Sequence, residues 1–392
     1  MAIKFKSLAQ PDLLKRIQPE NLIRLLEDHR IFFEMKGFDV PRDARLEIDY
    51  LTLAAVLAQP DEDMPGDLVD ALHLISTVGG DDRFDELLDL AGANEIEVDG
   101  DTTALDLATA IYLKNPAALS RKENEEFFQK RKTFESFRAA DPTITVAIED
   151  LPADLGPLEA SLDQYCQRKK RGVGCRIIRT DSEGEVRFLV VHGQPCRREP
   201  SRKGPKSTST FFRPERTDLV IYDAVHNELR INAGTIGDLK EYRAQFGARL
   251  FGDEGKFVFA EKYTLDPLKH DPHSALACRD VAGIESVALR EVEYSWGGAF
   301  DHVEIHRADG LLNALALIRR TIEAEAHIRK AVFKVKLTGE KQARSVTVKA
   351  GNKSGYNRGE EAALIEQWLR ARGFVLVGEA ANAQAEPALA GA

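Results

Sequence analysis

Three acidic residues around one predicted hairpin have the chemistry of a metal-binding site. Asp218, Asp223 and Glu228 lie beside two β-rich segments, 219–222 and 229–232, which are separated by a short turn. Carboxylates are ligands that Mg²⁺ prefers, and bound divalent ions activate water for phosphodiester hydrolysis. The three acids are therefore the candidate catalytic residues of one alternative, a metal-dependent nuclease.

The sequence Glu228-Leu229-Arg230 resembles the E-x-K half of the PD-(D/E)xK nucleases. Arginine stands where that family has lysine, and Asp223 and Glu228 flank the predicted turn. The resemblance implies phosphodiester cleavage with a divalent metal. No Walker A loop, dinucleotide-binding glycine motif, serine-hydrolase elbow or kinase motif is present in the sequence. The sequence therefore favours a protein without catalytic activity.

A second candidate metal site lies on the predicted strand 302–307. His302, Glu304 and His306 occupy alternate positions, and alternate side chains of a strand share one face. A cluster of histidine and carboxylate suits zinc or iron. The other interpretation is the solvent-facing side of an amphipathic strand, and on that basis we expect no bound metal and no cofactor.

The most distinctive feature of the sequence is a run of positive charge in a chain of formal net charge -10. Twelve Lys/Arg and four Asp/Glu lie between residues 167 and 206. Lysine and arginine neutralise phosphates and release counterions, so this cluster predicts salt-sensitive binding to DNA or RNA. The predicted contact residues are Arg168, Lys169, Lys170, Arg171, Arg197, Arg198, Arg202, Lys203, Lys206 and Arg213.

Part of this stretch has the composition of a flexible, exposed loop. Residues 195–210 contain Pro, Gly, Ser, Thr and several Lys/Arg, and they cannot bury enough apolar surface to fold alone. The following Phe211 and Phe212 offer rings that could stack on the bases of a single strand. The alternatives are a loop that docks on an acidic protein surface and a solvated loop without a partner.

Charge and periodicity divide the chain into an acidic helical front part and a mixed back part. Residues 1–110 hold 24 acidic and 10 basic residues, and apolar residues recur there at helical spacing. We predict an α+β multidomain protein in which an all-helical acidic N-terminal domain is followed by antiparallel β-meander/helix domains of ββα type. The predicted boundaries are 1–116 (acidic helical domain), 117–142 (charged connecting helix), 143–270 (α+β domain with the basic loop), 284–379 (α+β domain, ββαββαβ) and 380–392 (disordered tail).

The cysteines and the hydropathy of the chain indicate its compartment. Its four cysteines form no C-x-x-C pair, and no apolar run reaches the roughly 18 residues of a membrane span. Disulfides are rare in the reducing cytoplasm. We therefore expect a cytoplasmic protein that does not enter a membrane.

These features together predict a non-catalytic accessory or adaptor protein that binds nucleic acid. The basic stretch 168–216 would contact a phosphate backbone, and the acidic helical domain would bind a protein partner or a second copy of the chain. Two alternatives stay open: the metal-dependent nuclease, and a scaffold subunit of a protein assembly without nucleic acid.

Overall fold

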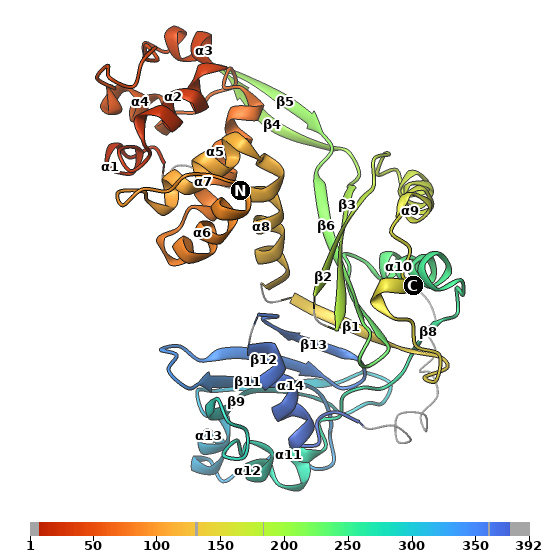
Figure 1. The fold of residues 1–392 in the computed structure, drawn as a ribbon. Helices are drawn as coiled ribbons and strands as arrows, with labels where there is room; N and C mark the ends of the chain where they lie inside the picture. Colours follow the sequence, from red (N-terminus) through yellow and green to blue (C-terminus); the bar gives the residue numbers. More distant parts are fainter. Residues whose placement is uncertain (1–7, 130–131, 183, 360, 377–392) are drawn as a thin grey trace. The chain divides into compact units, whose positions relative to one another are not determined.

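The computed structural model describes residues 8–129, 132–182, 184–359 and 361–376. The chain forms two compact units, Met1–Phe127 and Phe128–Ala392. The described part of the first unit is helical, whereas the second unit combines helices with a large antiparallel sheet (Figure 1). The mixed α+β class predicted from the sequence is confirmed. The predicted tail 380–392 lies outside the described residues.

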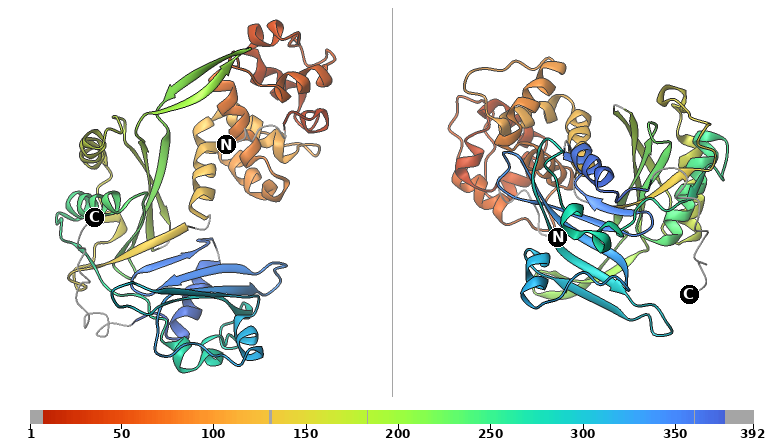
Figure 2. Two further views of the ribbon diagram at one scale, coloured as in Figure 1. Left: turned by 180° about the vertical axis from the view of Figure 1, so that it is seen from behind. Right: turned by 90° about the horizontal axis from the view of Figure 1, so that it is seen from below.

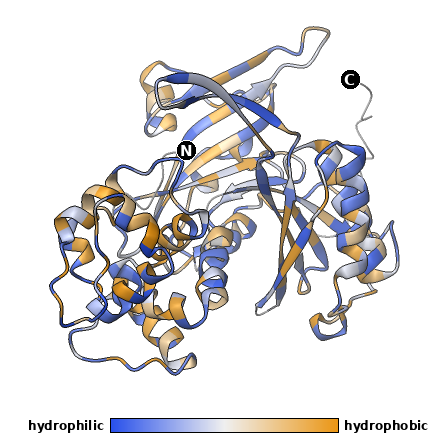
Figure 3. Cartoon of the chain, turned by 90° about the horizontal axis from the view of Figure 1, so that it is seen from above, coloured by the Kyte–Doolittle hydropathy of each residue, from blue (hydrophilic) through white to orange (hydrophobic). Residues whose placement is uncertain are grey.

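The helices of the first unit mix polar and apolar residues (Figure 3). Their buried side chains, mostly aliphatic with some phenylalanine, form one hydrophobic core. Two of them begin at side-chain caps, where Asp49 accepts from Thr52 N and Thr103 accepts from Asp106 N. The elements are α1 (Pro11–Leu14), α2 (Pro19–Glu27), α3 (Arg30–Met35), α4 (Tyr50–Ala58), α5 (Gly66–Val78), η2 (Asp81–Arg83), α6 (Phe84–Ala93), α7 (Ala104–Lys114) and α8 (Pro116–Gln129), which continues past the boundary.

A buried carboxylate fixes α7 against the start of α2. Asp106 accepts hydrogen bonds from Gln18 N at 2.8 Å and from Asn21 Nδ2 at 2.9 Å. Thr103 donates its hydroxyl to Arg16 O at 2.7 Å. The first N–H groups of a helix have no partner inside it, so Asp106 of α7 supplies a partner for the N–H of Gln18, the N-cap of α2.

The second unit is built on one antiparallel sheet. Its strand order is β10-β9-β11-β12-β13-β1-β7-β6-β3-β2, with β8 also paired to β1, while β4 and β5 form a separate two-stranded sheet. The strands are β1 (Lys132–Ala139), β2 (Arg176–Ser182), β3 (Glu185–Gly193), β4 (Arg197–Lys203), β5 (Lys206–Phe212), β6 (Glu215–Asp223), β7 (Glu228–Asn232), β8 (Phe257–Phe259), β9 (Ile284–Ser295), β10 (Val303–Arg307), β11 (His327–Leu337), β12 (Arg344–Lys349) and β13 (Lys353–Tyr356).

Strand β1 lies in the middle of this sheet, where the sequence predicted the second half of a connecting helix over 117–142. The helix α8 ends at Gln129, and β1 pairs with β13 on one side and with β7 on the other. The helix prediction for this half was wrong. Phe134 and Phe137 are buried in the sheet, and this packing overrides the helical propensity of the charged residues around them, Lys132, Glu135 and Arg138.

The sheet carries two hydrophobic cores on opposite faces. Glu135 of β1 pairs with Ile231 of β7 and with Lys353 of β13, so these side chains share a face, and Ile231 belongs to the core under α9 and α10. Ser354, next along β13, points to the other face, where its partner Val348 belongs to the core under α11–α14. The predicted domains 143–270 and 284–379 therefore share one sheet through β1 and do not fold around separate sheets.

The helices of the second unit lie at these two cores (Figures 1 and 2). Within the described residues, no helix combines the length and apolar character needed to cross a bilayer. The elements are η3 (Ile148–Asp150), α9 (Gly156–Arg168), α10 (Ile236–Phe251), α11 (Pro267–His270), α12 (Pro272–Ala275), α13 (Leu311–Leu317) and α14 (Glu361–Ala371).

Most of segment 195–210, predicted as a flexible loop, is a β-hairpin formed by β4 and β5. Lys203 pairs with Lys206 across a two-residue turn of Gly204 and Pro205, and Gly204 has a φ of +58°. Glycine at the first turn position is typical of a type II′ hairpin. The loop prediction was wrong because it rested on the lack of apolar side chains, whereas this pairing needs only backbone groups and a suitable turn.

Candidate nucleic-acid interface

The hairpin of residues 197–212, here named the basic arm, extends the β3–β6 ladder beyond the main sheet (Figure 1). β3 and β6 pair as far as Gly193 and Glu215, and Gln194 N then donates to Pro214 O at 2.7 Å. After a short irregularity, β4 and β5 pair along seven positions. At about 3.3 Å per residue, this length corresponds to roughly 23 Å.

Both faces of the basic arm carry positive charge. Cross-strand partners share a face, and Arg198 pairs with Phe211 while Arg197 pairs with Phe212. One face therefore holds Arg198, Arg202, Ser207, Ser209 and Phe211, and the other holds Arg197, Glu199, Ser201, Lys206, Thr208, Thr210 and Phe212.

The arm has no hydrophobic core of its own among its described side chains. Phe211 is 69% exposed and Phe212 is 39% exposed, and the hydrophobic clusters of the described residues include neither. A single two-stranded hairpin is marginally stable in water. The arm is therefore a suitable element to be stabilised by a partner of opposite charge.

Arg213 holds the base of the arm against the loop that follows α9. Its Nη1 donates to the carbonyl oxygens of Lys170 at 2.8 Å and of Gln194 at 2.9 Å. The approach requires glycine at 193, because a Cβ there would lie 2.3 Å from Arg171 O. The base of the arm is thus held by hydrogen bonds from the Arg213 side chain to backbone carbonyl oxygens, although the arm itself is exposed.

Arg171 has a structural role. Its guanidinium donates to both carboxylate oxygens of Asp238, at 2.7 and 3.2 Å, and Tyr165 donates its hydroxyl to the same carboxylate at 3.0 Å. Burial, with the neighbouring Asp238, raises the pKa of Tyr165, which keeps this donor protonated. The Arg171 side chain, which follows α9, thus joins this end of α9 to α10 through Asp238.

The structure groups the predicted contact residues into two places. The arm carries Arg197, Arg198, Arg202, Lys203 and Lys206, and the side chain of Lys203 lies outside the described part of the structure. The base carries Arg168, Lys169, Lys170, Arg171 and Arg213, of which all but Arg171 are exposed.

Asp218, the first of the three acids proposed as metal ligands, is fully buried. Its Oδ1 accepts from Arg216 Nε at 2.7 Å, and its Oδ2 accepts from the Tyr242 hydroxyl at 3.0 Å and lies 3.2 Å from His192 Nε2. Burial alone would raise the pKa of Asp218, but the hydrogen bonds with His192 and Arg216 outweigh it and hold the pKa below its ordinary value. Asp218 is thus a neutralised structural anion.

Asp223 and Glu228 lie directly opposite each other on β6 and β7. Asp218 is five positions from Asp223 along β6, so it points to the other face of the sheet. The three acids therefore do not converge, and the described residues contain no cluster of His, Cys, Asp and Glu able to hold a metal ion. This arrangement does not assemble the metal site of the nuclease alternative.

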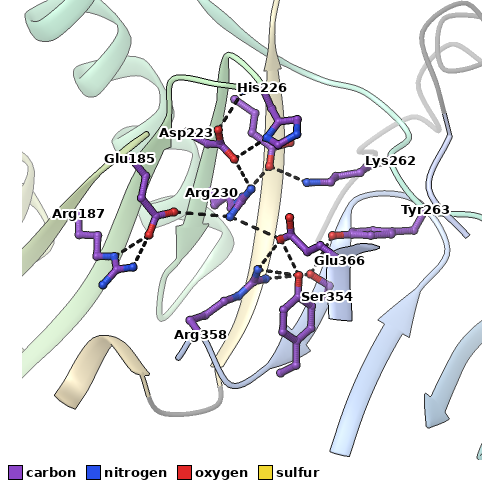
Figure 4. A network of polar contacts seen from close by, with 12 residues as sticks. Glu185, Arg187, Asp223, His226, Arg230, Lys262, Tyr263, Ser354, Arg358 and Glu366 are labelled. Carbon is purple, nitrogen blue, oxygen red and sulfur yellow. Dashed lines mark hydrogen bonds and ion pairs between the residues drawn. The ribbon is translucent and has the colours of Figure 1, made fainter. Parts of the chain in front are cut away.

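Arg230 occupies the centre of the carboxylates on this face (Figure 4). Its Nε donates to Glu228 at 2.6 Å, another nitrogen donates to Asp223, and Lys262 Nζ reaches Glu228 at 2.6 Å. Burial opposes ionisation of Glu228, but Lys262 and Arg230 outweigh it and hold its pKa well below the ordinary range. The motif that resembles a nuclease half-site is thus a buried ion network.

The network continues into the other half of the sheet. Glu366 of α14 accepts from Tyr356 at 2.7 Å and from Arg358 at 3.0 Å, and Arg230 Nη1 lies 3.6 Å from it. Burial would raise the pKa of Glu366, but Arg230 and Arg358 lower it to about 2. Arg230 therefore links β7 to α14 and joins the two halves of the unit electrostatically.

The three residues of the second predicted metal site do not converge either. Glu304 Oε1 lies 2.6 Å from His306 Nε2, whereas His302 is exposed and precedes the first residue of β10. The carboxylate also lies 3.8 Å from Arg320. Glu304 and His306 form a hydrogen-bonded pair, and His302 does not join them in a cluster of the described residues.

The sequence contains a signal for the ion network that the nuclease interpretation did not use. Glu228 and Arg230 are two residues apart on a strand and so share a face, which predicts an ion pair on that strand. The partners Lys262, Arg358 and Glu366 come from distant parts of the chain, and a single sequence offers no means to place them.

Sequence comparison gives no relative from which a role could be transferred. No protein-family model matches the chain, and a search of curated protein sequences finds no match.

Proposed function

We propose that this protein is a non-catalytic accessory protein that binds the phosphate backbone of nucleic acid through the basic arm. The supporting observation is an exposed two-stranded hairpin with arginine on both faces and no core of its own. A two-stranded β-ribbon fits the major groove of DNA, which is about 12 Å wide. Cations on its two faces would then meet the phosphates on the two sides of the groove.

The base of the arm enlarges this proposed surface. Lys169 and Lys170 are exposed beside the Arg213 clamp, and Arg168 lies 3.7 Å from Glu241. Because Arg213 fixes the arm to this loop, cations at the base and along the arm would act on one polyanion. The proposed contact set is Arg168, Lys169, Lys170, Arg197, Arg198, Arg202, Lys203, Lys206 and Arg213.

A binding role is favoured over the nuclease alternative by the state of the acidic residues. Asp218, Asp223 and Glu228 are each buried and engaged by a positively charged side chain. A carboxylate paired in this way has little capacity left to hold a divalent cation. The proposal therefore assigns no catalytic residue.

We further propose that the acidic front unit binds a protein partner. The excess of acidic residues over 1–110 supports a partner with a basic surface, and Ile31, Met35 and Leu51 are at least 70% exposed on α3 and α4.

In the scaffold alternative, the basic arm docks on another subunit of a protein assembly and does not bind nucleic acid. Measurement of the mass in solution at low and high salt tests the scaffold alternative, because charge-driven self-docking weakens as salt rises.

The four free cysteines support the cytoplasm as the proposed compartment of the protein.

The test is the salt dependence of binding to labelled duplex DNA, single-stranded DNA and RNA. The arm variant replaces Arg197, Arg198, Arg202 and Lys206 by glutamine, and we expect its affinity to fall strongly. If all four meet duplex phosphates, the slope of log affinity against log salt should flatten by up to about 3.6. A control with the same charge change replaces four exposed cations of the same unit: Arg279, Arg319, Lys341 and Lys349.

Three results decide between the proposals. Loss of binding in the arm variant with retention in the control supports the basic arm as the interface. An equal loss of affinity in both variants would show that binding depends on the net charge of the protein and not on the basic arm. Wild-type protein that binds none of the three polymers would overturn the proposal.

A further inference from the structure

The two outer strands of the large sheet differ in how their edges are covered. β2 lies at one end of the strand order and β10 at the other. Along β2, Glu159 of α9 accepts a hydrogen bond from Ile177 N at 2.7 Å, and Arg179 donates to the carbonyl oxygens of Ile148 and Pro152. Backbone groups on an open edge pair readily with another chain, so folded proteins usually cover them. The edge of β2 is covered in this way.

The edge of β10 is open among the described residues. Ala308 N donates to Arg290 O at 3.1 Å, and with the register of β9 and β10 this bond places the hydrogen-bonded pairs at the even-numbered residues of β10. The backbone N–H and C=O groups of Val303, Ile305 and Arg307 therefore point away from β9. No other described strand pairs with β10 on that side.

Large apolar side chains accompany this open edge. Val303 and Ile305 lie on one face of β10, and Ile305 is 52% exposed although it occupies the middle of the strand. Trp296 and Phe300, in the segment between β9 and β10, are exposed as well. Exposed apolar side chains beside an open strand edge are typical of a surface that binds another protein chain.

The sequence of β10 is complementary to itself when the strand is reversed. In antiparallel pairing with a second copy about a two-fold axis at Ile305, the Ile305 side chains of the two copies face each other and Val303 faces Arg307 of the partner subunit. Glu304 then faces His306 of the partner subunit. Registers centred one residue away place Glu304 or His306 opposite its own copy, and like charges directly opposite are destabilising.

We propose that β10 pairs with the β10 of a second copy across this two-fold axis, so that the two sheets continue as one. The outward backbone groups of Val303, Ile305 and Arg307 supply the hydrogen bonds, and the two Ile305 side chains form the apolar centre of the contact. A two-fold contact of this kind is closed, and the covered edge of β2 offers no second edge for a longer assembly. The proposal does not depend on nucleic-acid binding by the basic arm.

The first experiment is analytical ultracentrifugation of the full-length protein across the micromolar range. We expect a monomer–dimer equilibrium in the wild type, with a dissociation constant about tenfold or more higher in Ile305→Pro, which lacks the outward N–H at the centre of the contact. Proline is tolerated on an edge strand where the N–H faces solvent, so the β9–β10 ladder stays intact. Ile305→Lys tests the same position without a backbone change, because it places two like charges opposite each other.

A matched control replaces an exposed apolar residue elsewhere in the second unit. Val225→Lys, in the turn between β6 and β7, should dimerise within about twofold of wild type. Circular dichroism checks that each variant is folded. Wild-type protein that stays monomeric would overturn the proposal and leave the open edge to an extended segment of another protein. A dimer that persists in the folded Ile305 variants, or that Val225→Lys also loses, would contradict it equally.

The salt dependence separates this contact from charge-driven docking of the basic arm. A dimer held by backbone hydrogen bonds and isoleucine should persist at high salt, whereas a dimer that dissociates as salt rises is held by charge and refutes the contact through β10. The arm variant should dimerise as the wild type does, so the inference and the proposed function can fail separately.

Disulfide cross-linking tests the register directly. Of the four cysteines, Cys196 is exposed and the others are buried, so the background is Cys196→Ser. Ile305→Cys places two thiols on directly opposed residues, whose Cα atoms are about 5.5 Å apart, a distance that a disulfide spans. Val303→Cys, on the same face, leaves its two thiols roughly 13 Å apart along the strands, which a disulfide does not span.

A mild oxidant should therefore give a covalent dimer with Ile305→Cys and not with Val303→Cys. Cross-linking in neither variant, or to an equal extent in both, would show that the two strands do not pair in this register and would refute the proposal.

Discussion

Arg230 is the residue on which the interior of the second unit depends most. It is buried and faces the carboxylates of Glu185, Asp223, Glu228 and Glu366. Removal of one partner from a buried ion pair leaves an uncompensated charge, at a cost of about 3–5 kcal/mol. We therefore expect Arg230→Met to lower the free energy of unfolding by at least this amount, as measured by urea denaturation. The exposed substitution Arg279→Met should change it by less than about 0.5 kcal/mol, and a similar small effect at Arg230 would refute this role.

Glu366 gives the same network a dependence on pH. Its pKa is lowered from 4.5 to about 2 in the folded protein. A carboxyl group with a lowered folded pKa contributes stability that is complete above its unfolded pKa and is lost as the pH falls toward the folded value. We expect Glu366→Gln to abolish this contribution, so that stability falls less steeply than in wild type between pH 4.5 and about 2. Parallel urea-unfolding curves for the two proteins across this range would contradict the assignment.

Sequence reasoning at the residue scale finds local relations and misses remote ones. The alternation Glu228, Leu229, Arg230 correctly places the acid and the base on one face of a strand. It does not reveal that Lys262 joins Arg230 in neutralising the acid, because Lys262 comes from the segment that follows β8. The same residues fit both a nuclease half-site and a buried ion network. Only the partners from distant parts of the chain show which of the two is present.

At the scale of elements, the basic arm should be removable without damage to the fold. The described arm residues contribute nothing to the hydrophobic cores, and Gln194 and Pro214 already lie within hydrogen-bonding distance at its base. Replacement of residues 195–213 by Asn-Gly, a favoured two-residue hairpin turn, also removes the Arg213 hydrogen bonds to Lys170 O and Gln194 O. We expect it to lower the free energy of unfolding by about 2 kcal/mol or less.

Circular dichroism and urea denaturation measure this stability, and binding to the nucleic acids used above measures the function. The excised protein should be folded and should bind weakly. An excised protein that loses several kcal/mol of stability would show that the arm is part of the folding unit. One that is stable and binds as before would remove the arm from the proposed interface.

The same elements show which parts of the fold can be predicted from one sequence. Helices of the first unit follow from their apolar spacing and from caps such as Asp49 and Thr103. β1 and the basic arm do not, because each is a strand whose charged or polar side chains suggest a different state. In β1 the deciding contribution is tertiary burial of Phe134 and Phe137, and in the arm it is backbone pairing closed by Gly204.

At the scale of the whole molecule, the two units have separate hydrophobic cores. One core contains residues of the first unit, and the other two contain residues of the second. Both tryptophans of the chain, Trp296 and Trp368, belong to the second unit, and Trp368 is fully buried. Tryptophan fluorescence therefore reports on unfolding of the second unit, while far-ultraviolet circular dichroism includes the helices of the first.

This separation predicts that substitutions act on one unit at a time. Leu107→Ala in the first core should cost about 2–5 kcal/mol and shift the circular-dichroism transition while the fluorescence transition stays in place. Arg230→Met should shift the fluorescence transition, because its buried partners all lie in the second unit. If Leu107→Ala moves the fluorescence transition as well, the two units unfold as one cooperative body. A protein partner bound at the acidic unit would then also alter the stability of the unit that carries the basic arm.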